Sequence, residues 1–199
     1  MMKTKLMLFF KKIIPKSGRA FRGFVSGLYE FVELLAFTVL AIFLLTTLVF
    51  RHTVVWGDSM NNTLQTGEHL LISNLFYTPQ NGDVIVIDDD NVYDKVLIKR
   101  VIAVGGQSVK VTNEGVFVDG EQLNEEEYAL FLHPLPPSYY FEDTVPEGHL
   151  FVMGDNRCNS FDSMDFGYQF VDERAVLGKA VIRLYPFSIF VDGIPHPKK

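Results

Sequence analysis

The longest apolar stretch in the chain runs from Leu34 to Phe50 and reads LLAFTVLAIFLLTTLVF, without a charge, a proline or a glycine. A helix of these seventeen residues rises about 25 Å. Adding Phe31 and Val32, with Glu33 near the interface, brings the length close to the roughly 30 Å of a hydrocarbon core. A helix buried in a soluble core would carry a polar stripe, whereas this stretch offers only threonine hydroxyls. We therefore expect a transmembrane anchor over residues 29–50.

A strand-like pattern follows this stretch, with apolar runs separated by glycine-containing turns such as Asn81-Gly82-Asp83 and Gly105-Gly106. The segment VKVTNEGVFVDGEQL is typical of a hairpin. The expected fold class is mainly β: an antiparallel β domain over 51–199, with a smaller β insertion at about 106–148. One short helix is expected over Asn124–Leu132. The expected strands are His69–Ile72, Val84–Ile87, Lys95–Val104, Val109–Val111, Val116–Val118, Leu150–Met153 and Lys179–Tyr185.

The distribution of charge gives the anchor a direction. Residues 1–50 contain seven lysines and arginines, all before the apolar stretch, and only Arg51 follows it closely. By the positive-inside rule, a basic tail over 1–28 lies in the cytoplasm and the β domain lies outside a single-pass cell membrane. The tail can also bind anionic lipid, so the bilayer is an expected partner. A cleavable signal peptide is the alternative, but TLVFRHTVVW contains no small-x-small cleavage site.

Composition excludes several other kinds of function. Residues 51–199 carry 11 basic and 22 acidic residues, so no nucleic acid is expected as a partner. The five histidines are scattered, and the acidic run at 88–90 is typical of a solvated turn, so we expect neither a metal nor another cofactor. The single cysteine, Cys158, rules out a disulfide within the chain.

Two cations interrupt an apolar strand in the segment VLIKRVIAV. In a strictly alternating strand, Lys99 shares its face with Leu97, Val101 and Ala103, and Arg100 lies on the opposite face. One of the two cations must therefore lie on a largely apolar face. Burial moves the pKa of a lysine from its ordinary value toward neutrality, and a neutral lysine can accept a proton from a hydroxyl. Arginine stays protonated, so Lys99 is the candidate base and Arg100 needs a carboxylate partner.

Two polar segments could supply the remaining groups. GDSMNNTL contains Ser59, which by itself is an ordinary turn serine; Asn61 replaces the second glycine of a Gly-x-Ser-x-Gly elbow. No histidine has a local context that identifies it as a base. GDNRCNSFDSMDFG, over residues 154–167, offers a carboxylate for Arg100 and a hydroxyl that could orient a lysine amine.

Together these segments resemble the type I signal peptidases, membrane-anchored serine proteases that remove signal peptides from exported proteins. The resemblance covers the whole chain in order: tail, anchor, Ser59-Met60-x-x-Thr63-Leu64, Gly82-Asp83-Val84, Lys99-Arg100-Val101, and Gly154-Asp155-Asn156-Arg157 with Asn159-Ser160-x-Asp162-Ser163. Each motif alone is weak, but their order after an anchor is specific to this family.

The resemblance implies a function for each matching residue. Ser59 would be the nucleophile, Lys99 the general base, and Ser160 a hydrogen-bond partner of the lysine amine. Arg100 would pair with Asp155. The Ser59 backbone N–H would hold the oxyanion, and Gly57 stands where some members have a hydroxyl that helps. The substrates would be secretory preproteins cleaved after a small-x-small site, and residues near Val55, Met60 and Ile98 would line the pocket for the small side chain.

The chain departs from the family pattern at several positions. Asn62 replaces the usual proline after the serine motif, and Gly105 and Gln107 replace a proline and an aspartate after the lysine strand. Met164 replaces an arginine, which removes the expected partner of Asp162. These changes leave Ser59 and Lys99 in place.

Two other classes of function compete with the protease. A non-catalytic relative could act as an assembly or binding factor at the outer membrane face, but it would be expected to lose Ser59 or Lys99. A self-cleaving repressor can share Ser–Lys chemistry, but it needs a DNA-binding segment, and residues 1–28 are too short for one.

Overall fold

A computed structural model describes residues 19–61, 63–88, 95–130, 140–164, 170–185, 187–191 and 194–195. The chain divides into two compact units, Met1–Thr47 and Leu48–Lys199. Several predicted features lie outside the described residues: the first part of the basic tail, most of the acidic run at 88–90, and Asn62.

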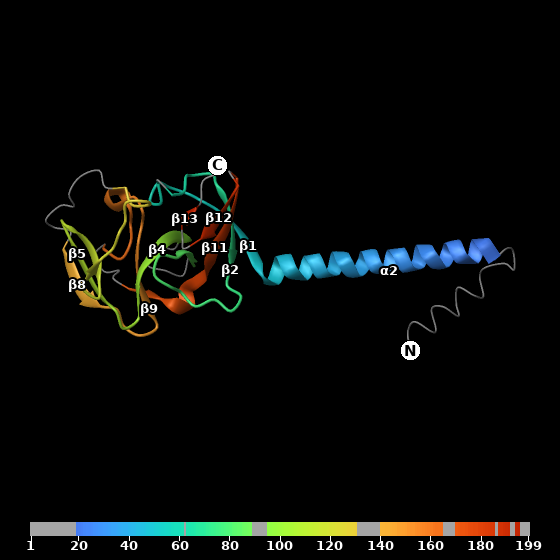
Figure 1. The fold of residues 1–199 in the computed structure, drawn as a ribbon, viewed down its shortest axis with the longest axis horizontal. Coiled ribbons are helices and arrows are strands. Elements are labelled where there is room, and N and C mark those ends of the chain that lie inside the picture. The colour runs from blue at the N-terminus through green and yellow to red at the C-terminus, as the bar shows by residue number, and fades with distance from the viewer. Residues whose placement is uncertain are drawn as a thin grey trace. The chain divides into compact units, whose positions relative to one another are not determined.

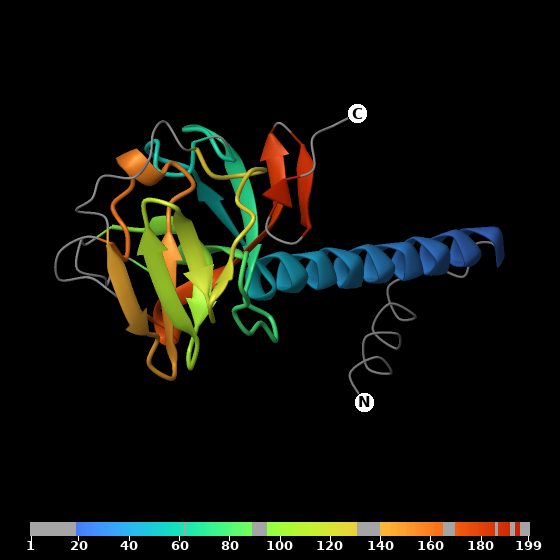
Figure 2. The same ribbon diagram turned by 60° about the vertical axis from the view of Figure 1, so that its left-hand side comes forward.

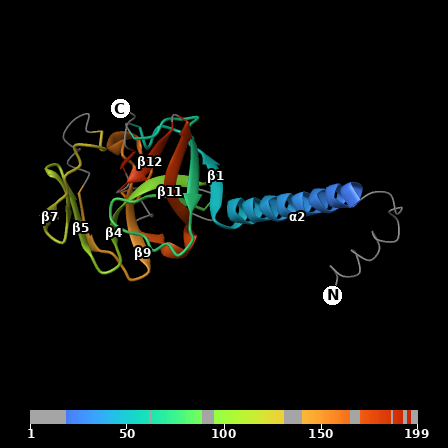
Figure 3. The ribbon, with the colours of Figure 1, turned by 45° about the vertical axis from the view of Figure 1, so that its right-hand side comes forward.

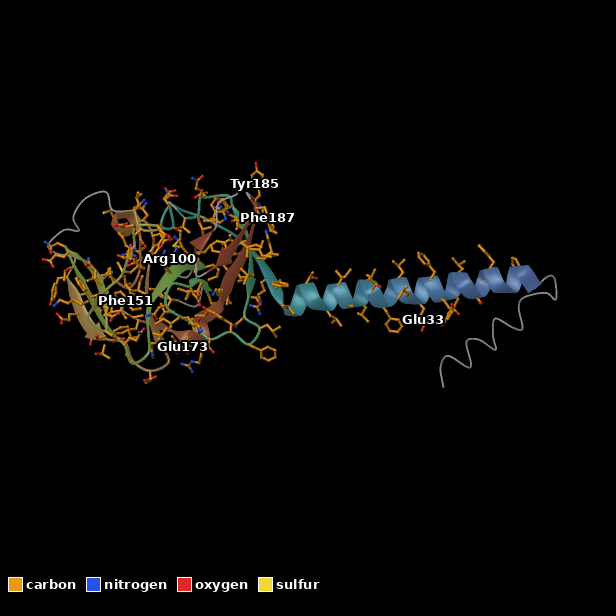
Figure 4. All side chains as sticks on the ribbon, in the orientation of Figure 1. Glu33, Arg100, Phe151, Glu173, Tyr185 and Phe187 are labelled. Atoms are coloured by element: carbon orange, nitrogen blue, oxygen red, sulfur yellow. The ribbon has the colours of Figure 1, made fainter. Side chains whose placement is uncertain are left out.

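The first unit contains one long helix among its described residues, α2, which covers Arg19–Leu48 (Figure 1). The helix begins before the expected anchor of residues 29–50. It also ends two residues before the expected end, and Phe50 already belongs to a strand. Its segment Gly23–Leu44 has a mean hydropathy of 1.9, and none of it is buried within the protein. Glu33 projects from the side of this helix (Figure 4). The helix is therefore long and apolar enough to cross a membrane.

Two threonine hydroxyls in α2 are satisfied by the helix itself. Thr38 Oγ1 donates a hydrogen bond to the Leu34 carbonyl oxygen at 2.8 Å, and Thr46 Oγ1 donates to the Ile42 carbonyl oxygen at 2.9 Å. Since hydrocarbon offers no partner to a polar group, these internal bonds make the hydroxyls compatible with a membrane.

The second unit is built on an antiparallel sheet, which has nine strands among the described residues. Its main order is β1-β2-β11-β3-β4-β9-β10, and β12 pairs with β11 and β13 (Figure 3). Two 3-10 turns, Arg157–Asn159 and Glu173–Ala175, interrupt the connections. The strands are β1 (Phe50–Val54), β2 (His69–Ser73), β3 (Val84–Ile87), β4 (Leu97–Val104), β9 (His149–Met153), β10 (Val171–Asp172), β11 (Val176–Tyr185), β12 (Ser188–Val191) and β13 (Ile194–Pro195).

A smaller sheet follows β4 in the chain and has four strands among the described residues, in the order β7-β6-β5-β8 (Figure 2). The strands are β5 (Ser108–Thr112), β6 (Gly115–Val118), β7 (Glu121–Gln122) and β8 (Phe141–Thr144). The predicted hairpin is confirmed, because β5 and β6 pair antiparallel from Thr112 opposite Gly115. The chain then returns to the main sheet through β9, which pairs with β4.

Strand β4 lies at the centre of the packing and contributes to each of the three hydrophobic clusters, with Ile98, Val101 and Ile102 in different ones. The pairing of β4 with β9 shifts register between Val101 and Ala103. Ile102 and Ala103 consequently enter the same cluster, so the strict alternation expected for this strand is wrong beyond Val101.

Each strand expected from the sequence corresponds to an observed strand, and the mainly β antiparallel fold class is confirmed. The short helix expected from Asn124 is wrong for its described part, which forms a turn over 126–128. That segment instead contacts the residues after β9, with Leu130 in an isolated parallel bridge to Asn156.

Candidate active site

Ser59 lies in a tight turn after β1, where the neighbouring residues hold the backbone. The backbone N–H of Asn61 donates to the Asp58 carbonyl oxygen at 3.0 Å, and Thr66 Oγ1 donates to the Gly57 carbonyl oxygen at 2.9 Å. Gly57 has φ of 85°, which glycine adopts without strain. The next side chain, Met60, is 2% exposed and packs into the core. The serine is thus held half-buried at the surface by a buried neighbour.

Lys99 reaches this serine from the middle of β4. Its side chain is 2% exposed, and its Nζ donates a hydrogen bond to Ser59 Oγ at 2.8 Å. The structure therefore brings the predicted nucleophile and the predicted base into direct contact, across 40 positions of sequence.

Arg100, which follows Lys99 in β4, forms a buried ion pair with Asp155. Figure 4 labels Arg100 within the β domain. Arg100 Nε and Nη2 donate to the two carboxylate oxygens of Asp155 at 2.8 and 2.7 Å. Arg100 Nη1 donates to the Gly82 carbonyl oxygen at 2.7 Å, and Thr63 Oγ1 donates to Asp155 Oδ2. The predicted pairing of Arg100 with Asp155 has the planar two-bond geometry that suits arginine.

The segment 154–160 packs directly behind Ser59. The Asn156 N–H donates to the Ser59 carbonyl oxygen at 2.9 Å, and Asn156 Nδ2 donates to the Asp58 carbonyl oxygen at 3.0 Å. A side-chain carbon on Gly154 would come within 2.4 Å of the Ser59 carbonyl oxygen and 2.2 Å of Ser160 Oγ. Gly154 is therefore required by close approach of the backbone.

Ser160 lies beside Gly154, but it does not make the hydrogen bond expected of it. Ser160 Oγ is buried and has no hydrogen-bond partner among the residues that the structure describes, so the predicted bond to the Lys99 amine is absent here. The hydroxyl is displaced toward Gly154, which leaves room for it by lacking a side chain. Asn156 Oδ1 is buried without a partner in the same described part of the chain.

Asp162 keeps a structural function although Met164 replaces its expected arginine partner. Its Oδ2 accepts a hydrogen bond from the Gly154 N–H at 2.9 Å, and its Oδ1 accepts one from the Met164 N–H at 3.1 Å. Backbone donors therefore help to hold this carboxylate, and through it Gly154.

The residues expected to line a substrate pocket come together in part. Val55, Met60 and Ile98 belong to one hydrophobic cluster, while Gly57 is exposed. A cavity of about 290 Å³ lies elsewhere, between the loop at 74–79 and residues 173–176, and none of the predicted site residues lines it.

The described histidines have partners of their own. His52 Nε2 and His69 Nδ1 lie 2.8 Å apart on β1 and β2, and His149 Nδ1 contacts the Glu147 carbonyl oxygen at 3.1 Å. Within the described ranges, no three metal-binding side chains group closely enough to hold an ion. His133 and His196 lie outside the described residues.

A second buried ion pair, which was not expected from the sequence, lies at this site. Arg157 Nη1 and Nη2 donate to the two carboxylate oxygens of Glu125 at 3.0 and 2.5 Å. Burial disfavours the charged guanidinium, but the Glu125 charge and hydrogen bonds outweigh this and raise the pKa of Arg157. Burial, followed by the Glu125 charge, raises the pKa of Tyr128. Glu125 could not be recognised from its local sequence, since it belongs to a run of three glutamates.

Comparison with known proteins places this chain among the signal peptidases. A model of the family described as signal peptidase, peptidase S26, matches residues 28–185. A probable signal peptidase I-1 of Synechocystis sp. is 38% identical over 170 residues, which cover 80% of this chain and 83% of the relative. A signal peptidase I of Leptolyngbya laminosa is 31% identical over 183 residues, covering 86% and 87%. A signal peptidase I P of Bacillus subtilis subsp. natto is 27% identical, covering 87% and 95%.

Proposed function

Because this chain belongs to the signal peptidase family, peptidase S26, and is a type I signal peptidase, we propose that Ser59 and Lys99 form its catalytic pair. The observation that carries the proposal is the 2.8 Å separation of Lys99 Nζ and Ser59 Oγ. The protein is a peptidase with one apolar N-terminal helix, and its substrates are preproteins with signal peptides.

The environment of Lys99 supports its function as a base. At 2% exposure the ammonium form loses most of its hydration, and loss of hydration favours the neutral amine. A neutral amine at the observed distance can accept the Ser59 hydroxyl proton through its lone pair. Arg100, one residue further along β4, stays charged and is neutralised by Asp155.

The reaction proceeds in two halves. Ser59 Oγ gives its proton to Lys99 Nζ and bonds to the scissile carbonyl carbon, and the Ser59 N–H stabilises the oxyanion. The carbon–nitrogen bond then breaks, and the Lys99 ammonium returns the proton to the leaving amine, which leaves an acyl group on Ser59. Water next gives a proton to Lys99 and attacks the acyl carbon, and Ser59 Oγ leaves with that proton. Gly57 offers no side-chain donor to the oxyanion.

Ser160 would act on Lys99 in the bound state rather than in the free one. Its hydroxyl is buried next to Gly154 and has no hydrogen-bond partner among the described residues. A rotation about its side-chain torsion on substrate binding would bring this hydroxyl toward the lysine amine, since catalytic hydrogen bonds often form only in the complex.

The substrate would bind as an added strand beside the segment that precedes Ser59. The cluster of Val55, Met60 and Ile98 would line a shallow pocket for a small side chain before the cut, which selects a small-x-small site. The α2 helix would anchor the protein in the lipid bilayer, with the N-terminus in the cytoplasm and residues 51–199 outside. The domain limits expected from the sequence were a tail at 1–28, an anchor at 29–50 and a catalytic domain at 51–199 with its insertion at about 106–148. The anchor would instead follow α2, which covers Arg19–Leu48, and the catalytic domain would begin with β1 at Phe50.

The test uses purified full-length protein in detergent and a precursor with an Ala-x-Ala site before the mature sequence. The wild type should release the signal peptide, and Ser59→Ala, which removes only the hydroxyl, should release none. Cleavage by Ser59→Ala at the wild-type rate would exclude Ser59 as the nucleophile. Binding of the precursor without cleavage by the wild type would favour the non-catalytic assembly factor instead.

A further inference from the structure

Glu125 and Arg157 form an ion pair that is as buried as the pair of Arg100 and Asp155. The Arg157 and Glu125 side chains are 0% and 3% exposed, and two hydrogen bonds join them. Two charges removed from water carry a large desolvation cost, so such a pair is weak evidence for stability alone. The position of this ion pair relative to Ser59 indicates that it helps to hold the backbone next to the serine.

Arg157 connects Glu125 to the backbone behind the serine. While Nη1 and Nη2 bind Glu125, Arg157 Nε donates to the Gly154 carbonyl oxygen at 3.0 Å. Gly154 in turn lies so close to the Ser59 carbonyl oxygen that no side chain fits between them. A movement of Arg157 would therefore be transmitted through Gly154 to the turn that carries Ser59.

The segment Glu125–Leu130 also contacts the first ion pair. The Leu130 N–H donates to the Asp155 carbonyl oxygen at 2.7 Å. The Arg100 guanidinium lies 4.0 Å from the centre of the Tyr128 ring, and Tyr128 Oη donates to Glu125 Oε1 at 3.3 Å. This segment comes from the connection after β7, so it links the smaller sheet to the residues around Ser59.

We propose that Glu125 is a positioning residue for catalysis, which holds residues 154–160 against the Ser59 turn through Arg157. This proposal rests on the catalytic functions proposed above for Ser59 and Lys99. Glu125 touches neither the substrate nor the reacting atoms. It keeps the buried guanidinium neutralised, and the guanidinium keeps the Gly154 carbonyl in place.

Loss of the Glu125 charge should alter the chemistry as well as the stability. Without that charge the buried Arg157 guanidinium would be less well neutralised, so it would move toward water and draw Gly154 with it. Lys99 precedes Arg100, which pairs across the sheet with Met153, and Gly154 follows Met153 directly. Water admitted at this point would favour the ammonium form of Lys99, so the acid limb of the pH–rate profile would move to higher pH.

The first variant is Glu125→Gln, which keeps the shape of the side chain and removes its charge. For precursor cleavage, kcat should fall by about tenfold or more, because small misplacements of reacting groups are costly, while KM changes by less than about twofold. The acid limb should move up by about half a pH unit or more. The control is Glu68→Gln, because Glu68 forms a partly buried pair with an arginine, Arg183, which lies on β11 outside residues 154–160. Its acid limb should stay at the wild-type position even if its Tm falls.

A second variant separates positioning from stability. The double substitution Glu125→Leu with Arg157→Met replaces both charges by apolar groups, so it should recover the Tm lost in Glu125→Gln. It lacks the donor to the Gly154 carbonyl, so its kcat should stay low. Recovery of wild-type kcat by this double variant would overturn the proposal, as would an unchanged kcat and acid limb in Glu125→Gln.

The single cysteine allows a measurement that does not depend on activity. Cys158 is exposed and follows Arg157 directly, so a nitroxide attached to it in full-length protein reports the mobility of residues 154–160. Glu125→Gln should increase that mobility and Glu68→Gln should not. Equal mobility in the two variants would contradict the proposal. Absence of cleavage by the wild type would instead contradict the catalytic pair, and the nitroxide result would still decide the positioning function.

Discussion

Lys99 Nζ lies 2.8 Å from Ser59 Oγ, although the two residues belong to different parts of the main sheet. Lys99 comes from the central strand β4, whereas Ser59 lies in the turn after the edge strand β1. The segment 154–160 holds the Ser59 turn in place, because a backbone N–H of this segment donates to the Ser59 carbonyl oxygen. A base on a rigid strand thus faces a nucleophile on a turn that is held from two sides.

The first prediction concerns the base. Lys99→Ala should abolish precursor cleavage, and Lys99→Arg should do the same because arginine cannot give up its proton. Wild-type activity should rise with pH as Lys99 loses its proton, since only the neutral amine can accept the serine proton. Initial rates across the neutral and alkaline range measure this. Single substitutions of the five histidines serve as controls, and loss of cleavage in one that still folds would favour a histidine base.

The second prediction concerns the pair of Arg100 and Asp155. Removing either partner takes the paired charge away from a buried ion, so Arg100→Met or Asp155→Ala should lower the free energy of unfolding by about 3–5 kcal/mol. The two substitutions together should cost less than the sum of the single ones. Urea unfolding of the four proteins in a double-mutant cycle gives the coupling, and additive effects would mean that the two side chains do not interact.

The third prediction concerns Asp119, at the turn that closes the smaller sheet. Hydrogen bonds from the Ser108 N–H and then from the Gln107 side chain lower the pKa of this carboxyl below its ordinary value. A carboxyl whose pKa is lower in the folded state stabilises the fold at pH values above its ordinary pKa. This stabilisation is lost as the pH falls through the lowered pKa. Asp119→Asn, which tolerates the φ of 53°, should be less stable than the wild type near neutral pH.

The stability difference between Asp119→Asn and the wild type should shrink as the pH falls below about 4, because the unfolded carboxyl takes up its proton there, whereas the folded carboxyl does so only at lower pH. Thermal unfolding at several pH values measures the difference. A constant difference across that range would show that the Asp119 charge does not act in the folded state.

Gln107 fits this chain in place of the usual aspartate because both ends of its amide are bonded. Its Nε2 donates to Asp119 Oδ2, and its Oε1 accepts from the Val104 N–H at 3.0 Å.

The fourth prediction concerns the substrate. Precursors with Ala, Leu, Phe or Asp at the first and third positions before the cut should differ strongly in kcat/KM. Only small side chains at these positions should allow efficient cleavage. Large side chains would overlap with the buried cluster of Val55, Met60 and Ile98. The measurement is kcat/KM for each precursor. Equal values for Phe and Ala precursors would contradict a small pocket, even if Ser59 proves catalytic.

The fifth prediction concerns orientation. The basic residues before α2 should keep the N-terminus in the cytoplasm, so protease added to intact spheroplasts should digest the domain that carries Ser59. A cytoplasmic marker protein should survive the same treatment. Protection of the domain until the cells are lysed would reverse the proposed topology.

The sequence by itself determined the features that depend on residues close together in the chain. Continuous hydropathy predicted a long apolar helix, and alternation with glycine-rich turns predicted most strands between His69 and Tyr185, but not β8 or β10. The order of motifs indicated the family, and the charged pair inside β4 identified Lys99 as unusual. The strand β1 was missed because its apolar start at Phe50 continues the pattern of the anchor, so hydropathy alone could not separate them.

Only the tertiary structure decided which distant groups meet. Ser59 and Lys99 are brought together by the pairing of strands, and Glu125 reaches Arg157 from a run of three acidic residues that looked like a helix start. The register shift after Val101 and the position of the Ser160 hydroxyl also depend on packing between strands. The physical reason is that a local pattern specifies which face of a strand is buried, whereas register, bulges and buried ion pairs depend on partners far away in the chain.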